Sequence, residues 1–335
     1  MNMKKWLDAM MQTGEKKSMP ILSFPSVQLL GVSVETLCHD SRLQAEGMAA
    51  VAARTPAAAA VSMMDLSVEA QAFGCRVKMS ENEVPTVVGA LVTDEDEAEA
   101  LQVPRVGAGR TGLYIEAMKL AAEKITDRPV FAGVIGPFSL AGRLMDVQEA
   151  LANCIAEPDM VHIIMEKTTE FLINYITAYK NETGAAGVVM AEPLTGLLSP
   201  ALAEEFSEPY VKKIVDAVQD DDFIVIYHNC GDNILLMADS IFRVGARGYH
   251  FGNAIDMAAM MEKAPSDVLV MGNVDPAGQF MHGTPDSIRE ETLRIMNACC
   301  KYPNFVISSG CDIPPASKWE NIDAYFAAVG EFYGK

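Results

Sequence analysis

A histidine and two cysteines have the residue types and the spacing of a metal site. His228 and Cys230 stand two residues apart, directly after the apolar run Phe223–Tyr227. Residues two apart in an extended chain point to the same face, so we expect both side chains on one face where a strand ends. Cys311 follows a second apolar run, Phe305–Ser309. One imidazole and two thiolates are ligands that suit zinc, with a fourth position left open or lightly held.

The same residue types also allow an ordinary structural interpretation. A His-x-Cys pair occurs often by chance, and buried cysteines commonly fill space in a core. Glu192, at the end of another apolar run, is a candidate fourth ligand, a substrate-binding carboxylate or a cap for the helix that follows. Asn273 and Asp275 end a further run, where they either bind substrate or form a turn. We treat Glu192, Asn273 and Asp275 as candidate catalytic residues.

The metal site requires that the ends of distant strands meet. Eight short apolar runs recur along the chain, with stretches of helical spacing between them. Such runs indicate strands buried on both faces, as in a parallel sheet. They predict a single (β/α)8 TIM barrel over residues 1–335, in which strand ends converge at one mouth; a doubly wound open sheet is the alternative. The predicted strands are Pro20–Phe24, Val61–Leu66, Val130–Gly136, Gly187–Pro193, Phe223–Tyr227, Gly248–Gly252, Val268–Val274 and Phe305–Ser309.

Two segments depart from this alternation. Residues 1–20 predict an amphipathic helix ahead of the barrel. Residues 81–126 contain an acidic run, a proline and a glycine-rich turn, and we interpret them as an insertion after the second strand, with the role of a lid. Residues 107–112 match the pattern G-x-G-x-x-G. We reject a dinucleotide site there, because no good strand precedes the pattern.

The composition excludes several classes of partner. The chain has 335 residues, with 26 Lys and Arg against 45 Asp and Glu, for a formal charge of -19. Such a chain repels nucleic acid and anionic membrane surfaces. We see no signal peptide and no apolar run long enough to span a membrane, so we expect a cytoplasmic protein. The remaining histidines, His39, His162 and His282, are expected to be ordinary surface or packing residues.

Five segments resemble, in order, the cobamide-dependent methyltransferases of the uroporphyrinogen decarboxylase superfamily, and the resemblance covers nearly the whole chain. They are residues 63–74, 133–141, 227–231, 272–276 and 309–314. The resemblance implies a (β/α)8 barrel with zinc held by His228, Cys230 and Cys311. It also implies a methyl group that moves to or from the cobalt of a corrinoid carried by a partner protein.

Members of this kind divide by their small molecule. Some transfer the methyl group to a thiol such as coenzyme M, which zinc would ionise; others take it from a donor such as a methoxylated aromatic. The zinc ligands alone do not choose between the two. A porphyrinogen decarboxylase is the alternative function, but the decarboxylases begin with an arginine-bearing segment, and residues 22–31 contain no arginine.

Apolar side chains near the predicted strand ends favour an aromatic donor or contact with the corrin edge. The residues that we expect to face the cofactor or to line the mouth are Phe24, Met63, Met64, Phe138 and His250. A thiol that carries a sulfonate would need a cationic group in its binding site, and no obvious one stands at a predicted strand end. Arg143 and Arg110 are candidates without an assigned place. The sequence therefore tilts slightly away from coenzyme M.

Overall fold

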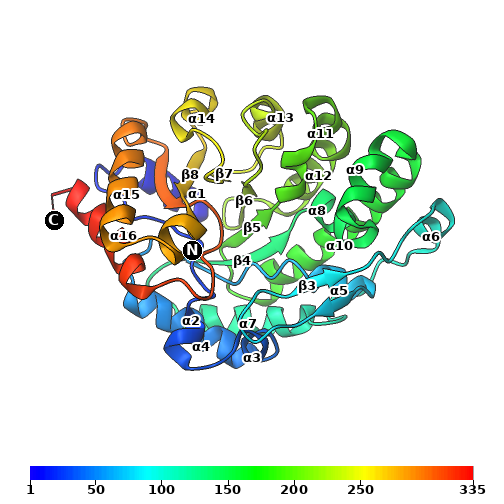
Figure 1. Cartoon of the computed structure of the whole chain (residues 1–335), viewed down its shortest axis with the longest axis horizontal. Helices are drawn as coiled ribbons and strands as arrows, with labels where there is room; N and C mark the ends of the chain where they lie inside the picture. The colour runs from blue at the N-terminus through cyan, green and yellow to red at the C-terminus, as the bar shows by residue number, and fades with distance from the viewer. Residues whose placement is uncertain (335) are drawn as a thin grey trace.

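A curled sheet of seven parallel strands lies at the centre of the molecule (Figure 1). The computed structural model describes residues 1–334. The strands follow the order β1-β4-β5-β6-β7-β8-β9, and β2 and β3 form a separate antiparallel hairpin. The strands are β1 (Ala60–Val61), β2 (Arg76–Lys78), β3 (Thr86–Val88), β4 (Val130–Ile135), β5 (Gly187–Ala191), β6 (Ile224–Asn229), β7 (Gly248–Phe251), β8 (Leu269–Val274) and β9 (Phe305–Ser309).

Helices connect the strands and surround the sheet (Figure 1). They are α1 (Met3–Gln12), α2 (Ser26–Leu30), α3 (Val34–Cys38), α4 (Ser41–Arg54), α5 (Val68–Phe73), α6 (Glu95–Ala100), α7 (Thr111–Lys124), α8 (Pro137–Met145), α9 (Val147–Ala156), α10 (Pro158–Glu182), η1 (Pro193–Leu197), α11 (Pro200–Phe206), α12 (Glu208–Val218), α13 (Ala238–Arg243), α14 (Met257–Lys263), η2 (Pro276–Met281), α15 (Pro285–Cys299) and α16 (Trp319–Phe332). Among residues 1–334, no helix combines the length and the apolar character needed to cross a membrane.

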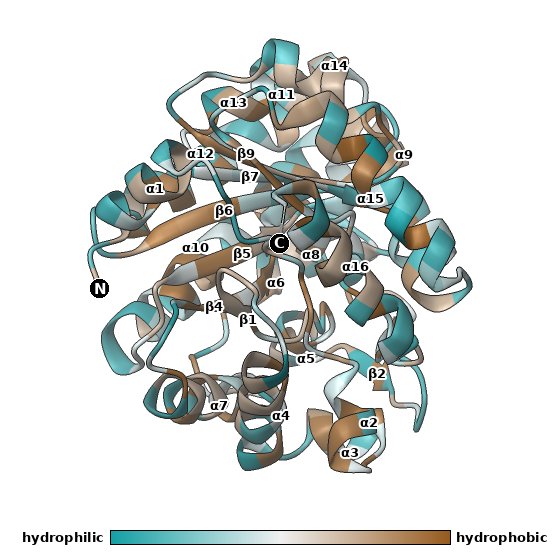
Figure 2. Cartoon of the chain, turned by 90° about the vertical axis from the view of Figure 1, so that its left-hand side faces the viewer, coloured by the Kyte–Doolittle hydropathy of each residue, from teal (hydrophilic) through white to brown (hydrophobic). Residues whose placement is uncertain are grey.

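The strands are apolar on both faces, and Figure 2 shows them as the brown centre of the molecule. In β6, Ile224 and Ile226 belong to an inner cluster inside the curled sheet, whereas Val225 and Tyr227 pack with the surrounding helices. This alternation follows from the period of two in a strand. His228 continues the inward series of Ile224 and Ile226, so its position in β6 directs it toward the interior.

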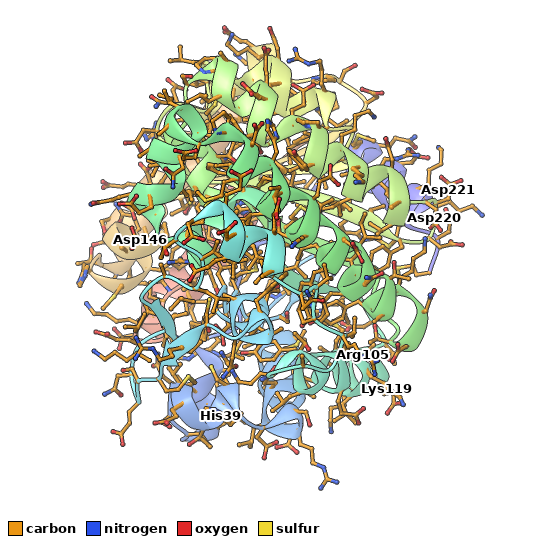
Figure 3. The ribbon with its side chains drawn as sticks, turned by 90° about the vertical axis from the view of Figure 1, so that its right-hand side faces the viewer. His39, Arg105, Lys119, Asp146, Asp220 and Asp221 are labelled. Carbon is orange, nitrogen blue, oxygen red and sulfur yellow. The ribbon has the colours of Figure 1, made fainter. Side chains whose placement is uncertain are left out.

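Helix α1 closes one end of the inner cluster. Its buried residues Met3, Leu7 and Met10 pack with the inward side chains of the strands. The backbone N–H groups of Met3 and Lys4 donate to the carbonyl of Asp221, at 2.7 and 3.0 Å. Asp221 stands in the turn that precedes β6 and is labelled beside Asp220 in Figure 3. The predicted amphipathic helix is therefore present, and it covers the end of the sheet opposite the carboxyl ends of the strands.

The predicted first strand, Pro20–Phe24, is wrong. An extended segment occupies the place between β9 and β1, but it makes only isolated hydrogen bonds: Met19 N donates to the carbonyl of Ile307 at 3.1 Å, and Ala58 N donates to the carbonyl of Ser18 at 2.8 Å. Pro20 has no N–H, so a regular ladder cannot continue. The seven other strands are present, but β1 consists of only two residues, Val61 from the predicted Val61–Leu66 and its neighbour Ala60.

The predicted insertion, residues 81–126, is corrected in its extent. Its last part forms α7, which packs along α4 as a regular outer helix of the fold. Only the β2–β3 hairpin and α6 project from the body of the molecule (Figure 1). The projecting part thus starts before residue 81 and ends before α7, and its role as a lid stays a prediction.

The G-x-G-x-x-G pattern anchors α7 to the chain that follows β1. The buried Arg110 guanidinium pairs with Asp65 at 2.5 Å and donates to Ser67 Oγ and Gln71 Oε1, both at 2.7 Å. Tyr114 donates a further hydrogen bond to Asp65, at 2.7 Å. All of these groups are polar and mutually satisfied, so Arg110 has a structural role and is not available to a substrate.

Candidate metal centre and substrate pocket

The structure brings His228, Cys230 and Cys311 together at the carboxyl ends of β6 and β9. One ligand atom from each residue lies within 4.8 Å of the other two. His228 Nε2 is 3.4 Å from Cys311 Sγ. His228 is buried, and the two cysteines are half-buried. Strands that are far apart in the sequence thus deliver three soft or borderline ligands to one point.

This arrangement fits a tetrahedral zinc ion. Bonds of about 2.3 Å to sulfur and about 2.0 Å to nitrogen place one nitrogen and two sulfurs about 3.5–3.8 Å apart. The hydrogen bond with Cys311 lowers the pKa of Cys230, and the His228 ring lowers it further. The same bond, together with burial, raises the pKa of Cys311. A bound cation would favour the ionised form of both thiols.

His250 lies behind His228. Its Nδ1 is 2.8 Å from His228 Nδ1, and its Nε2 is 2.8 Å from Ser308 Oγ. His250 is 1% exposed, so it does not line an open mouth as the sequence led us to expect. Burial and the neighbouring His228 lower its pKa well below the usual range. The reason for its position is the register of the sheet, which pairs His228 directly with His250.

Glu192, the candidate fourth ligand, accepts hydrogen bonds from the start of α8. Its carboxylate accepts from Phe138 N at 2.6 Å, from Ser139 N at 3.0 Å and Ser139 Oγ at 2.7 Å, and from Thr195 Oγ1 at 3.2 Å. Complete burial raises the pKa of Glu192 to about 7. These contacts cap α8, which precedes Glu192 in the chain. The sequence predicted a cap for the helix that follows, but Glu192 makes no side-chain capping hydrogen bond to η1. The group of possible metal ligands does not include it.

Asn273 and Asp275 make contacts that shape loops. Asn273 Nδ2 donates to the carbonyls of Gly252 and Ile255, at 2.9 and 3.0 Å. Asp275 Oδ1 accepts from the backbone N–H groups of the residues two and three positions ahead, at 3.0 and 2.8 Å. The Asp275 contacts form a turn, the alternative to substrate binding that the sequence left open. The Asn273 contacts instead hold the distant loop that follows β7, and a catalytic role for either residue stays a prediction.

The apolar residues predicted at the mouth are buried. Phe24, Met63 and Phe138 belong to the core between the sheet and the helices, and Met64 belongs to the inner cluster. None of the four lines the cavity at Cys230. Proximity to a predicted strand end therefore did not lead to exposure.

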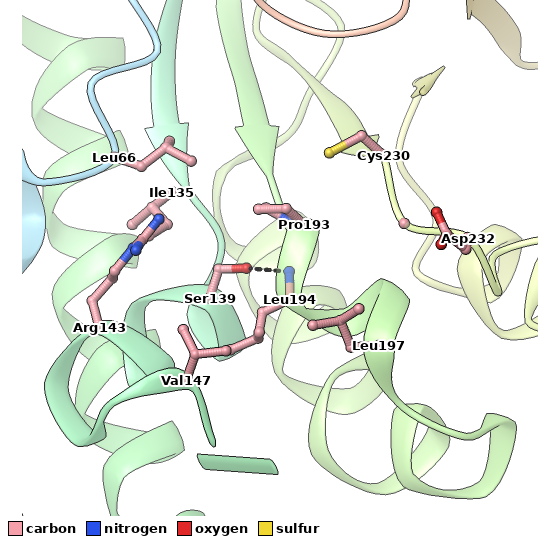
Figure 4. A pocket seen from close by; sticks show the side chains of 11 residues that line it. Leu66, Ile135, Ser139, Arg143, Val147, Pro193, Leu194, Leu197, Cys230 and Asp232 are labelled. Carbon is pink, nitrogen blue, oxygen red and sulfur yellow. Dashed lines mark hydrogen bonds between the residues drawn. The ribbon is translucent and has the colours of Figure 1, made fainter. Parts of the chain in front are cut away.

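A cavity of about 290 Å³ opens beside Cys230 (Figure 4). Its walls come from the segments that follow β1, β4, β5 and β6, and are mostly apolar. The lining residues are Leu66, Ile135, Ser139, Arg143, Val147, Pro193, Leu194, Leu197, Cys230, Gly231 and Asp232. A pocket of this size and polarity suits a small organic molecule.

Arg143 is the cation of this cavity. It lies on α8, and Figure 4 shows its side chain at the wall that Ile135 and Leu66 form. Within residues 1–334, no hydrogen bond or ion pair involves its guanidinium. Burial lowers the pKa of Arg143. Arg143 could not be placed from the sequence, because the identity of a helical residue does not show which face of the helix packs against the cavity.

The comparisons place the chain in a family. The model of the uroporphyrinogen decarboxylase (URO-D) family matches residues 22–332. The chain belongs to the URO-D family. The resemblance that the sequence motifs carried is thereby confirmed.

Similar members of the URO-D family include methyltransferases and decarboxylases. The chain is 28% identical to the methylcobamide:CoM methyltransferase MtbA of Methanosarcina acetivorans, over 74% of this chain and 72% of the relative. It is 26% identical to a uroporphyrinogen decarboxylase of Prochlorococcus marinus, over 64% and 61%. A methyltransferase structure from Methanosarcina mazei superposes with a TM-score of 0.85 at 26% identity, over 99% of both chains. At the level of enzyme class, these findings support the prediction of a methyltransferase.

Proposed function

We propose that this URO-D family member moves a methyl group from the cobalt of a corrinoid protein to the sulfur of a small anionic thiol, with zinc held by His228, Cys230 and Cys311. The observation that carries the proposal is the double position of Cys230. It belongs to the ligand cluster, and it lines the cavity that also contains Arg143. A substrate in this cavity is therefore next to the ligands and next to an unpaired cation.

Arg143 reverses the preference for an aromatic methyl donor that was inferred from the sequence. An aromatic methyl ether needs no cation, whereas an unpaired guanidinium in a mostly apolar cavity is a partner for an acid group. The similar methylcobamide:CoM methyltransferases are named for coenzyme M, which joins a thiol to a sulfonate. The cavity offers a partner for each end of such a molecule.

In this proposal, separate groups bind the acid end of the substrate and ionise its thiol. Arg143 binds and orients the acid group, and the apolar walls exclude water from the reacting sulfur. When bound, zinc supplies a positive charge that keeps a coordinated thiol ionised at neutral pH. The thiolate forms the new S–CH3 bond while the Co–CH3 bond breaks, and the bonding electron pair stays on cobalt. The corrinoid partner thus leaves with cobalt in the Co(I) state.

A porphyrinogen decarboxylase fits the site less well. Its substrate carries several carboxylates, whereas the cavity beside Cys230 contains one arginine and is bordered by Asp232. The second arginine that the sequence considered, Arg110, is paired with Asp65. No observation at this site favours decarboxylation over methyl transfer.

The metal site is tested by zinc content. We expect about one zinc per chain in the purified protein and less than about a tenth of that in Cys230→Ser or Cys311→Ser, because each change removes one of three protein ligands. Cys300→Ser is the matched control, since Cys300 is a half-buried free cysteine outside the ligand cluster. Full zinc in the Cys230→Ser, Cys311→Ser double variant would contradict the site.

The substrate class is tested by Arg143→Met with methylcobalamin as methyl donor. A charge-assisted hydrogen bond is worth about 1.5–3 kcal/mol, so we expect KM for a sulfonate thiol to rise about 10–100-fold. KM for a neutral thiol of the same length should change less than about 3-fold, because that substrate has no charge for Arg143 to bind. Equal effects on both thiols, or turnover of a methoxylated aromatic in place of any thiol, would reject the anionic-thiol assignment.

A further inference from the structure

Four polar groups inside the curled sheet form a continuous chain that ends at the candidate metal site. Ser308 Oγ donates to the carbonyl of Met19 at 2.7 Å. Ser308 Oγ is also 2.8 Å from His250 Nε2, and His250 Nδ1 is 2.8 Å from His228 Nδ1. Ser308, His250 and His228 are at most 1% exposed, so water does not compete for these contacts.

The direction of each hydrogen bond in this chain is fixed by what each atom can do. A carbonyl oxygen only accepts, so the single hydroxyl proton of Ser308 is used on Met19. Ser308 Oγ must then accept from His250, which places an N–H at His250 Nε2. A neutral imidazole has one N–H, so His250 Nδ1 is left with a lone pair that faces His228 Nδ1.

A second contact shows which ring nitrogen of His228 carries the proton. His228 Nδ1 is 3.2 Å from the carbonyl oxygen of His250. That oxygen can only accept, and the neighbouring His250 Nδ1 accepts as well, so His228 Nδ1 carries the proton. The lone pair of His228 then lies on Nε2, the atom that is 3.4 Å from Cys311 Sγ. The opposite tautomer would leave two buried acceptors facing each other and would aim a hydrogen atom at the cysteines.

We infer that Met19, Ser308 and His250 act as a positioning relay, which holds the proton of His228 on Nδ1 and keeps the Nε2 lone pair directed at the zinc position. The inference rests on the metal site of the proposed function. It gives His250 a role behind the ligand in place of one at the mouth. It also connects the site to the extended segment between β9 and β1, because that segment supplies the Met19 carbonyl. Partners of this kind orient a metal-binding histidine and raise its affinity for the ion.

Ser308→Ala removes the central hydroxyl of the relay with little change of shape. We expect the affinity for zinc, measured by competition with a chelator, to fall about 10–100-fold. Ser309→Ala is a closely matched control, since Ser309 is buried on the same strand and accepts from Ile21 N of the same segment at 3.1 Å, outside the relay. We expect its zinc affinity to stay at the wild-type value. Equal affinities for Ser308→Ala and Ser309→Ala would overturn the relay.

A second comparison separates positioning from folding. His250→Asn keeps a side-chain oxygen that can accept from His228 Nδ1, whereas His250→Leu does not, so Asn should retain more of the zinc affinity than Leu. In the zinc-free protein, ¹⁵N chemical shifts of the His228 ring should show the proton on Nδ1. A proton on Nε2 would overturn the inference. This readout needs no metal, so it decides the relay even if the wild-type protein binds no zinc, which would reject the proposed function alone.

Discussion

Glu69 is a carboxyl group whose surroundings oppose its charge. It is 2% exposed on α5, and its Oε1 accepts from Ile135 N at 3.1 Å. Within residues 1–334, Oε2 has no hydrogen-bond partner. Burial raises the pKa of Glu69 to about 8, so the group is protonated at neutral pH. The folded protein therefore holds this proton more tightly than an unfolded chain, where the pKa of a glutamate is about 4.3.

The sign of the pH dependence follows from this difference. The stability associated with protonated Glu69 is fully present below about pH 4 and is lost as the pH rises through about 8. Glu69→Gln resembles the protonated form at every pH. We expect its melting temperature, relative to wild type, to increase from pH 5 to pH 9, as measured by scanning calorimetry. Glu116→Gln, at an exposed position of α7, is the control; a flat difference for Glu69→Gln would contradict the raised pKa.

At the level of residues, the sequence located the candidate metal ligands, because the strand period of two and the convergence of strand ends are general rules. It did not locate Arg143 or the relay. The position of Arg143 depends on how α8 lies against the cavity. The contact between His250 and His228 depends on the register of β6 and β7, which no local pattern contains.

At the level of secondary-structure elements, helix α8 positions Arg143 at the cavity. It begins at Pro137, directly after Gly136, where an added Cβ would lie 2.3 Å from Glu192 Cγ. The Glu192 carboxylate accepts two of the free N–H groups at the helix start. The orientation of α8, and with it the position of Arg143, therefore depends on Glu192.

We expect Glu192→Gln to lower the free energy of unfolding by about 1–3 kcal/mol, because an amide N–H2 would face groups that donate. Urea denaturation measures this change. Zinc content should stay at the wild-type value if Glu192 is a helix cap, whereas loss of zinc would support the alternative of a fourth ligand. Glu182→Gln, at the exposed end of α10, should change neither quantity.

The element boundaries were predictable where a run of apolar residues was long and unbroken, as for Phe305–Ser309, which matches β9. The boundaries were not predictable where one residue interrupts the backbone hydrogen bonds of a strand. Pro20 prevents a regular first strand, and β1 ends at Val61, ahead of the segment in which Asp65 pairs with Arg110.

At the scale of the whole molecule, the inner cluster depends on α1. Leu7 is buried against inward strand residues, and Trp6 packs against Phe131 with ring centroids 6.0 Å apart. The interior of the sheet would be open to water at this end without the helix. The contacts of α1 that stabilise the inner cluster and the candidate metal site thus lie at opposite ends of the same sheet.

We expect Leu7→Ala to lower the free energy of unfolding by about 2–5 kcal/mol, the range for a large side chain removed from a core. Lys5→Ala, on the exposed face of α1, should change it by less than about 0.5 kcal/mol. Both are measured by urea unfolding. Similar values for the two variants would show that α1 does not contribute to the core.

The extended segment between β9 and β1 also bears on how the chain is made. Ile21 N reaches Ser309 Oγ across 288 positions of sequence. At about 5–20 residues per second, a ribosome needs roughly 15–60 s to add that length. During this interval the free edge of β1 and the inward apolar side chains have no partner from β9. The relay to His228 is therefore assembled only in the last step, when the final strand has been made.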